Sequence, residues 1–201
     1  MPLLVATGNP GKKREFQDLL APLQASLCFP TELSLNIAVL EDGETYAENA
    51  RKKALTYRQA TGMLTLADDS GLEVDALDGA PGIRSARYAP GRDVDRVTAL
   101  LAALNGVPSE KRSARFRCVV AIATTDGRIY SAEGVCEGQI TCEPAGEAGF
   151  GYDPIFYLPA YEQTMAQISS TEKNRISHRA RAIEAALPIL RHLLSEQESE
   201  K

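Results

Sequence analysis

The stretch Leu66–Tyr88, LADDSGLEVDALDGAPGIRSARY, sets two adjacent carboxylates, Asp68 and Asp69, directly after a short apolar run at 63–67. The apolar run predicts a strand, and the Ser-Gly pair that follows the carboxylates favours a turn. A strand that ends in paired carboxylates can hold a hard divalent cation at the edge of a sheet. An Asp pair before Ser-Gly is also an ordinary turn, so the motif alone leaves both interpretations open.

Outward from this stretch, helices separate the first strands, while the middle of the chain alternates like a β-meander. This order predicts a mixed α/β fold with one domain over 1–195 and a polar tail at 196–201. The predicted helices cover 12–20, 45–60, 93–104 and 177–194. The predicted strands cover 2–6, 26–29, 115–124, 128–136 and 138–142, with an extended segment at 33–39 and a loop at 78–88.

Composition narrows the class of protein. The net charge of -5 over 201 residues argues against a non-specific nucleic-acid binder, which would carry a basic patch. No apolar run approaches the ~20 residues of a membrane span, and Met1 leads straight into an apolar strand without a signal peptide. The four cysteines form no CxxC pair, which is typical of reduced thiols. We expect a cytoplasmic protein with no membrane partner.

The segment from Thr7 to Lys12, TGNPGK, lies between a predicted strand and a predicted helix. A glycine turn at a helix N-terminus exposes N–H groups and the positive end of the helix dipole, which suits phosphate. Lys12 adds a mobile positive charge. The spacing is not that of a Walker A loop, and an ordinary strand-to-helix turn has the same composition.

An acidic cluster at 41–44 precedes the helix that Thr45 opens. Carboxylates at this position are commonly a solvated helix N-terminus. The alternative is that Glu41 joins Asp68 and Asp69 as a metal ligand. Because Mg²⁺ binds through one or two carboxylates together with waters and phosphate oxygens, such a small set is sufficient.

Two further patterns suggest recognition of a flat, acceptor-rich group. The glycine-flanked aromatics of 149–154 can form a slot for a ring. Lys173 and Arg179 lie near the start of the last helix, where the dipole disfavours cations, so we expect them to face acceptors. His178 is open to two interpretations, a ligand contact or a packed residue.

Together these motifs resemble the inosine triphosphate pyrophosphatase family, whose members hydrolyse non-canonical purine nucleoside triphosphates. The resemblance implies an elongated twisted sheet with flanking helices, two lobes around a central cleft, and a homodimer. It also implies Mg²⁺-dependent hydrolysis of ITP, dITP and XTP to the monophosphate and pyrophosphate. The matching blocks occur in order at 6–12, 48–50, 67–88, 143–156 and 172–182.

The resemblance also assigns roles by position. Asp69 would be the general base, assisted by Lys12. The metal ligands would be Glu41 and one or both of Asp68 and Asp69. The residues that hold the triphosphate would be Thr7, Gly8, Asn9, Pro10, Gly11 and Lys12, and Ser70 would contact the substrate. The base pocket would consist of Phe150, Gly151, Tyr152, Asp153, Lys173, His178 and Arg179.

The donors implied for the base pocket give a physical reason for selectivity. Lys173 and Arg179 only donate hydrogen bonds, so they suit the 6-keto oxygen of hypoxanthine or xanthine and disfavour the 6-amino group of adenine. Two alternatives remain at this level. One is a pyrophosphatase for a pyrimidine or modified nucleoside triphosphate. The other is a nucleotide-binding module without catalysis, in which Asp68 and Asp69 only end a strand.

Overall fold

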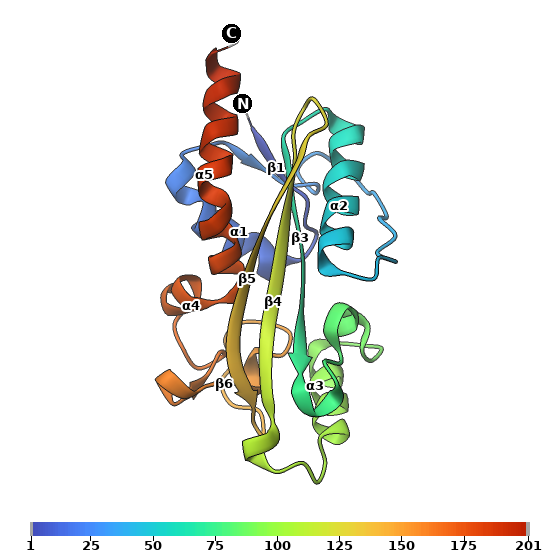
Figure 1. The fold of residues 1–201 in the computed structure, drawn as a ribbon, viewed down its shortest axis with the longest axis vertical. Coiled ribbons are helices and arrows are strands. Elements are labelled where there is room, and N and C mark those ends of the chain that lie inside the picture. Colours follow the sequence, from blue (N-terminus) through green and yellow to red (C-terminus); the bar gives the residue numbers. More distant parts are fainter. Residues whose placement is uncertain (1, 200–201) are drawn as a thin grey trace. The chain divides into compact units, whose positions relative to one another are not determined.

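The computed structural model describes residues 2–199, and its strands form one seven-stranded sheet in the order β2-β1-β3-β4-β5-β6-β7 (Figure 1). Strand β1 pairs in parallel with β2 and β3, whereas β6 pairs antiparallel with β5 and β7. The strands are β1 (Leu3–Val5), β2 (Leu27–Cys28), β3 (Thr65–Val74), β4 (Ser113–Ala123), β5 (Ile129–Ile140), β6 (Phe156–Leu158) and β7 (Gln163–Thr164). The prediction of a mixed α/β fold is confirmed.

Five α-helices flank the sheet within the described residues (Figure 1). Helix α2 begins where the sequence predicted, because the Thr45 side chain accepts the Glu48 N–H at 3.1 Å. It ends at Gly62, whose left-handed φ of 69° a glycine adopts without strain. The helices are α1 (Pro10–Leu20), α2 (Tyr46–Thr61), α3 (Asp93–Ala103), α4 (Ser170–Ile176) and α5 (His178–Ser199).

The chain forms two compact units, each with its own apolar core. The first unit comprises 2–69, 118–134 and 179–199, and the second comprises 70–117 and 135–178. Strands β3, β4 and β5 contribute residues to both. The first core joins β1, β3 and β4 to α1 and α5 through buried residues that include Leu66. The predicted tail at 196–201 is helical as far as Ser199, and residues 200–201 lie outside the described part.

Two strand predictions were wrong for local reasons. Strand β3 does not end at the Asp pair but continues to Val74, so the Ser-Gly pair is extended backbone rather than a turn. The two strands predicted at 128–136 and 138–142 are the single strand β5. Gly138 lies inside β5. A Cβ at this position would come within 2.6 Å of the Phe156 ring, which explains why a glycine occurs within the strand.

Two connecting segments also differ from the predictions. The segment 33–39, predicted to be extended, begins in a turn, in which Ser34 has a φ of 54°, and continues without regular structure. The predicted loop at 78–88 contains a 3-10 helix, Gly82–Arg87. Across residues 2–199, every helix is too short or too polar to cross a bilayer.

Candidate active site

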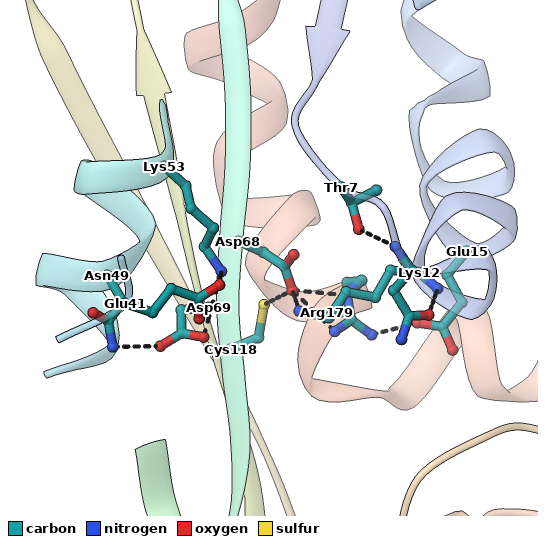
Figure 2. Close-up of polar contacts among 11 residues, drawn as sticks. Thr7, Lys12, Glu15, Glu41, Asn49, Lys53, Asp68, Asp69, Cys118 and Arg179 are labelled. Atoms are coloured by element: carbon teal, nitrogen blue, oxygen red, sulfur yellow. Dashed lines mark hydrogen bonds and ion pairs between the residues drawn. The ribbon is translucent and has the colours of Figure 1, made fainter. Parts of the chain in front are cut away.

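Strand β3 carries Asp68 and Asp69 side by side. Because successive side chains of a strand point to opposite faces, the two carboxylates leave β3 on opposite sides (Figure 2). Asp68 lies on the face of Leu66, toward α1 and α5, and Asp69 faces α2. Adjacent residues therefore belong to two different polar clusters.

The Asp68 cluster consists of Asp68, Lys12, Glu15 and Arg179. Asp68 Oδ2 accepts from Lys12 Nζ at 2.9 Å and from Arg179 Nη2 at 3.0 Å. Arg179 Nη1 donates to Glu15. Asp68 is 2% exposed and Arg179 is 1% exposed, so water screens these charges weakly. Two cations face two carboxylates, and the cluster as a whole is neutral.

This cluster fixes the ionisation of Asp68 and of the neighbouring Cys118. Burial on its own raises the pKa of Asp68, but the charges of Lys12 and Arg179 outweigh it and hold the pKa well below its usual range. Cys118 Sγ lies 3.9 Å from Asp68 Oδ2, and burial together with the Asp68 charge raises the thiol pKa to about 12. At neutral pH Asp68 is a carboxylate and Cys118 a thiol.

The loop between β1 and α1 is ordered by its own side chains. Asn9 Oδ1 accepts the Lys12 N–H at 3.0 Å, and Thr7 Oγ1 accepts the Asn9 N–H at 3.2 Å. Among residues 2–199, the Gly8 N–H has no hydrogen-bond partner, and a Cβ added there would meet no atom within 4 Å. The start of α1 thus offers an open N–H close to Lys12, which suits an anion.

The Asp69 cluster consists of Asp69, Glu41, Asn49 and Lys53. Asn49 Nδ2 donates to Asp69 Oδ2 at 3.2 Å. Lys53 Nζ lies 3.5 Å from Asp69 Oδ1 and 3.4 Å from Glu41 Oε1, so one cation stands between two carboxylates (Figure 2). Asn49 and Lys53 are four residues apart on α2 and therefore share a face of the helix.

The Asp69 cluster carries one excess negative charge, unlike the Asp68 cluster. Burial raises the pKa of Asp69, Lys53 and Lys12 oppose this only in part, and Glu41 adds to the increase. In the described part of the chain, no three Asp, Glu, His or Cys side chains gather closely enough to hold a metal by themselves. The expected grouping of Glu41 with both aspartates is not assembled, because the alternation of β3 turns Asp68 away.

In the second unit, Asp153 holds the turn at 149–154. Its Oδ2 accepts the Phe150 N–H at 2.8 Å and Lys173 Nζ at 2.5 Å. Lys173 Nζ lies 4.8 Å from the centroid of the Phe150 ring, within the range of a cation–π contact. Gly149 has a φ of 76°, and a Cβ there would collide with the Asp153 carboxylate. The turn therefore places an aromatic ring and a buried ammonium together.

The remaining residues of this turn are fixed by hydrogen bonds within the second unit. The Gly151 N–H donates to Asp93 Oδ2 at 2.7 Å. The buried Tyr152 donates its hydroxyl hydrogen to the Ser85 carbonyl at 2.9 Å. The first bond joins the turn to the start of α3, and the second joins it to the 3-10 helix Gly82–Arg87, so the turn is held at two points.

Several predicted site residues are placed differently from their sequence grouping. His178 stacks on Phe116 with ring centroids 4.7 Å apart and is 5% exposed, a packed position in the second unit. Arg179 was grouped with Lys173, but its guanidinium lies in the first unit on Asp68. Ser70 is half-buried and belongs to the second unit.

Sequence reasoning gave no role to three members of these clusters: Glu15, Asn49 and Lys53. Helical spacing could have found them. Glu15 follows Lys12 by three residues on α1, and Lys53 follows Asn49 by four on the helix that Thr45 caps. Residues at these spacings share one helix face, so Glu15 could have been found from Lys12, and Asn49 and Lys53 could have been found as a polar pair.

A sequence profile of the Ham1 family matches residues 3–189 of the chain. The chain belongs to the Ham1 family. A dITP/XTP pyrophosphatase of Desulforamulus reducens is 52% identical over 200 residues, which cover 98% of this chain and 100% of the relative.

Solved structures of Ham1 proteins agree over the whole fold. The Ham1 protein of Staphylococcus aureus has a TM-score of 0.82 and 38% identity, with 100% of each chain covered. The HAM1 protein of Coxiella burnetii has a TM-score of 0.84 and 40% identity, with 98% of this chain and 99% of that chain covered. The resemblance seen in the sequence motifs, and the α/β sheet with flanking helices that it implied, are confirmed.

Proposed function

We propose that the chain hydrolyses the non-canonical purine nucleoside triphosphates ITP, dITP and XTP to the monophosphate and pyrophosphate. The observation that carries this proposal is the Asp69 cluster, in which two carboxylates share a single ammonium and retain an excess negative charge. Such a cluster attracts a further cation, as a metal-dependent phosphoryl enzyme requires. The dITP/XTP pyrophosphatase at 52% identity supports the same activity.

The carboxylates of the Asp69 cluster fit a magnesium ion. Glu41 Oε1 and Asp69 Oδ1 already lie around one positive charge, Lys53 Nζ, at 3.4 and 3.5 Å. Two carboxylate oxygens suit Mg²⁺, which fills its other positions with water and phosphate oxygens. Asp68 was also expected to be a ligand, but we assign it to the neutral ion-pair cluster. When bound, Mg²⁺ polarises phosphate oxygens and makes a nearby water more acidic.

The groups around β1 and α1 would hold the triphosphate. Lys12 and the open N–H of Gly8 supply positive charge at the helix start, while Thr7 and Asn9 keep the loop in shape. Asp69 then orients a water for in-line attack on the α-phosphorus and accepts its proton, and pyrophosphate leaves.

The second unit would recognise the base through Phe150 and Lys173. The Phe150 ring offers a stacking surface, and Asp153 fixes the Lys173 ammonium beside it. A donor-only ammonium favours a 6-keto purine over adenine. We propose that Tyr152 and Gly151 shape this turn, that Ser70 contacts the substrate, and that His178 acts mainly by packing.

We propose further that the protein is a cytoplasmic homodimer whose partners are nucleotides rather than nucleic acid or membrane. The net charge of -5 supports the absence of a nucleic-acid partner. Sedimentation equilibrium tests the dimer directly. A monomer across micromolar concentrations would contradict it.

The test of the activity is pyrophosphate release from ITP, dITP, XTP, GTP, ATP, dTTP and UTP, each with Mg²⁺ and with a chelator. We expect rapid, Mg²⁺-dependent release from the inosine and xanthine nucleotides alone. Preference for a pyrimidine would keep the phosphate chemistry and reject the base assignment. Binding without release from any nucleotide would reject the enzyme.

A further inference from the structure

Asn49 is a fully buried polar residue of α2, and the reaction proposed above gives it no role. Its side chain is 0% exposed. It is the centre of the Glu-Asn-Ala motif at 48–50, one of the blocks that resemble the pyrophosphatase family. A buried amide is costly unless its oxygen and nitrogen are both bonded, and here both ends are used.

The two ends of the Asn49 amide join two separate parts of the Asp69 cluster. Its Oδ1 accepts the backbone N–H of Gly43 at 2.9 Å, and its Nδ2 donates to Asp69 Oδ2 at 3.2 Å. An N–H only donates and a carboxylate only accepts, so the amide has a single orientation that satisfies both partners. Asn49 thus connects the segment that carries Glu41 to the carboxylate of Asp69.

Packing at Gly43 makes this connection stiff. A Cβ at Gly43 would lie 2.8 Å from Asn49 Oδ1 and 2.8 Å from Glu48 Cβ, so the backbone approaches the amide as closely as a glycine allows. Glu41 is only two residues earlier in the chain. The position of the Glu41 backbone is therefore tied to the same amide that holds Asp69.

The amide also distinguishes the two oxygens of Asp69. Oδ2 is engaged by Asn49, whereas Oδ1 faces Lys53 and, beyond that ammonium, Glu41. A carboxylate that is held by one oxygen cannot rotate freely about the Cβ–Cγ bond of the aspartate. The other oxygen is then presented in one direction, toward the cation position that Lys53 marks (Figure 2).

We propose that Asn49 is a positioning residue of the pyrophosphatase reaction: it sets the separation of Glu41 and Asp69 and turns Asp69 Oδ1 toward the cation position. The inference rests on the function proposed above. It predicts that loss of the amide affects metal binding and turnover more than it affects binding of the nucleotide base, because Asn49 contacts neither the phosphate loop nor the second unit's turn in the contacts described.

The experiment compares Asn49→Ala with Thr45→Ala, a matched control on the same helix. Thr45→Ala removes the N-cap bond to Glu48 and loosens the start of α2 without touching the amide or Asp69. For Asn49→Ala we expect kcat for dITP to fall about 10- to 100-fold, the range for a hydrogen bond to a charged group, with KM little changed. We expect Thr45→Ala to lower Tm and leave kcat unchanged.

A second readout does not depend on turnover. Calorimetric titration of the nucleotide-free protein with Mn²⁺ alone should give a Kd about tenfold higher for Asn49→Ala than for the wild type, and an unchanged Kd for Thr45→Ala. Equal kcat and equal Mn²⁺ affinity in a folded Asn49→Ala protein would overturn the inference. If Asn49→Ala does not fold, Gly43→Ala, which presses on the same amide, is judged by the same two measurements.

The outcomes separate this inference from the proposed function. If the wild type releases pyrophosphate from dITP and Asp69→Asn does not, while Asn49→Ala behaves as the wild type, only the role of Asn49 fails. If the wild type releases no pyrophosphate, the proposed function fails, and the Mn²⁺ titration still decides whether Asn49 organises the two carboxylates.

Discussion

Asp68 and Asp69 are adjacent on β3, yet the fold shifts their pKa values in opposite directions. Burial raises both, but Asp68 lies between Lys12 and Arg179, which outweigh burial, whereas Asp69 shares one lysine with another carboxylate. Asp68 is thereby a permanent anion that holds cations in place. Asp69 is the more basic of the two, and it belongs to the cluster that carries an excess negative charge.

Replacement of Asp69 should separate activity from stability. We expect Asp69→Asn to lower kcat by about 10²- to 10⁴-fold, the usual contribution of a general base. A folded-state pKa above the unfolded value means that ionised Asp69 destabilises the protein, so the neutral amide should leave the free energy of unfolding equal or higher at pH 7. Pyrophosphate release and urea unfolding measure the two effects. Turnover near that of the wild type would reject Asp69 as the base.

Replacement of Asp68 should have the opposite signature in unfolding. Asp68→Asn leaves Lys12 and Arg179 without their shared carboxylate, and breaking a buried pair typically costs about 3–5 kcal/mol. The lowered pKa gives the same sign, because stability from Asp68 is present above its unfolded pKa and is lost as pH falls through the folded one. Urea unfolding at pH 7 tests this, and an unchanged midpoint would contradict it.

Lys53 should compete with the metal. Lys53→Met removes an ammonium 3.5 Å from Asp69, so we expect Mn²⁺ to bind the nucleotide-free protein about tenfold more tightly in calorimetry. Lys52→Met is the control, because Lys52 is the adjacent residue and pairs with the exposed Asp42 instead. Weaker Mn²⁺ binding in Lys53→Met would show that the ammonium helps to assemble the site rather than to occupy it.

Two glycines of similar φ allow a test of the turn that holds Lys173. Gly149→Ala adds a methyl group against the Asp153 carboxylate, while Gly62→Ala, at a φ of 69°, adds one where no atom of the described residues lies within 4 Å. Both substitutions carry the backbone cost of a positive φ, about 1 kcal/mol. We expect only Gly149→Ala to raise KM for dITP. Equal kinetics in both variants would mean that the turn does not contact the base.

The cysteines should differ in reactivity. Burial and the Asp68 charge raise the pKa of Cys118 to about 12, whereas Cys142 is exposed. We expect iodoacetamide at pH 8 to alkylate Cys142 and to spare Cys118 in the native protein, because the thiolate is the reactive form. Mass spectrometry of peptides identifies the modified residues. Early modification of Cys118 would indicate local opening around Asp68.

Local signals predicted much of the fold. Thr45 with Glu48, and Gly62, mark the ends of α2 because a cap and a left-handed glycine depend only on neighbouring residues. The Ser-Gly pair after Asp69 has the composition of a turn, and the prediction failed there. The Ser-Gly pair is extended because it belongs to β3, a central strand of the sheet, and the strands that pair with β3 are distant in the sequence.

The candidate site shows the same division. The loop of Thr7–Lys12 and the turn around Asp153 were recognisable because each is one continuous segment. Arg179 was assigned to the wrong neighbours by proximity in sequence to Lys173, since its partner Asp68 is 111 residues away. Which face of β3 each aspartate takes depends on how this strand lies between β1 and β4, and these partners are not marked in the sequence around the Asp pair.

The first unit is assembled from three separated stretches, and its core includes Leu190 and Leu193 of α5. During synthesis, β1, α1 and β3 leave the ribosome long before the residues that cover them. Until Arg179 arrives, Asp68 lacks one of its two counter-charges. In a nascent chain, the apolar side chains of β1 and β3 therefore stay uncovered until α5 is synthesised. A premature stop before α5 would yield a polypeptide that exposes these apolar strands to chaperones and proteases.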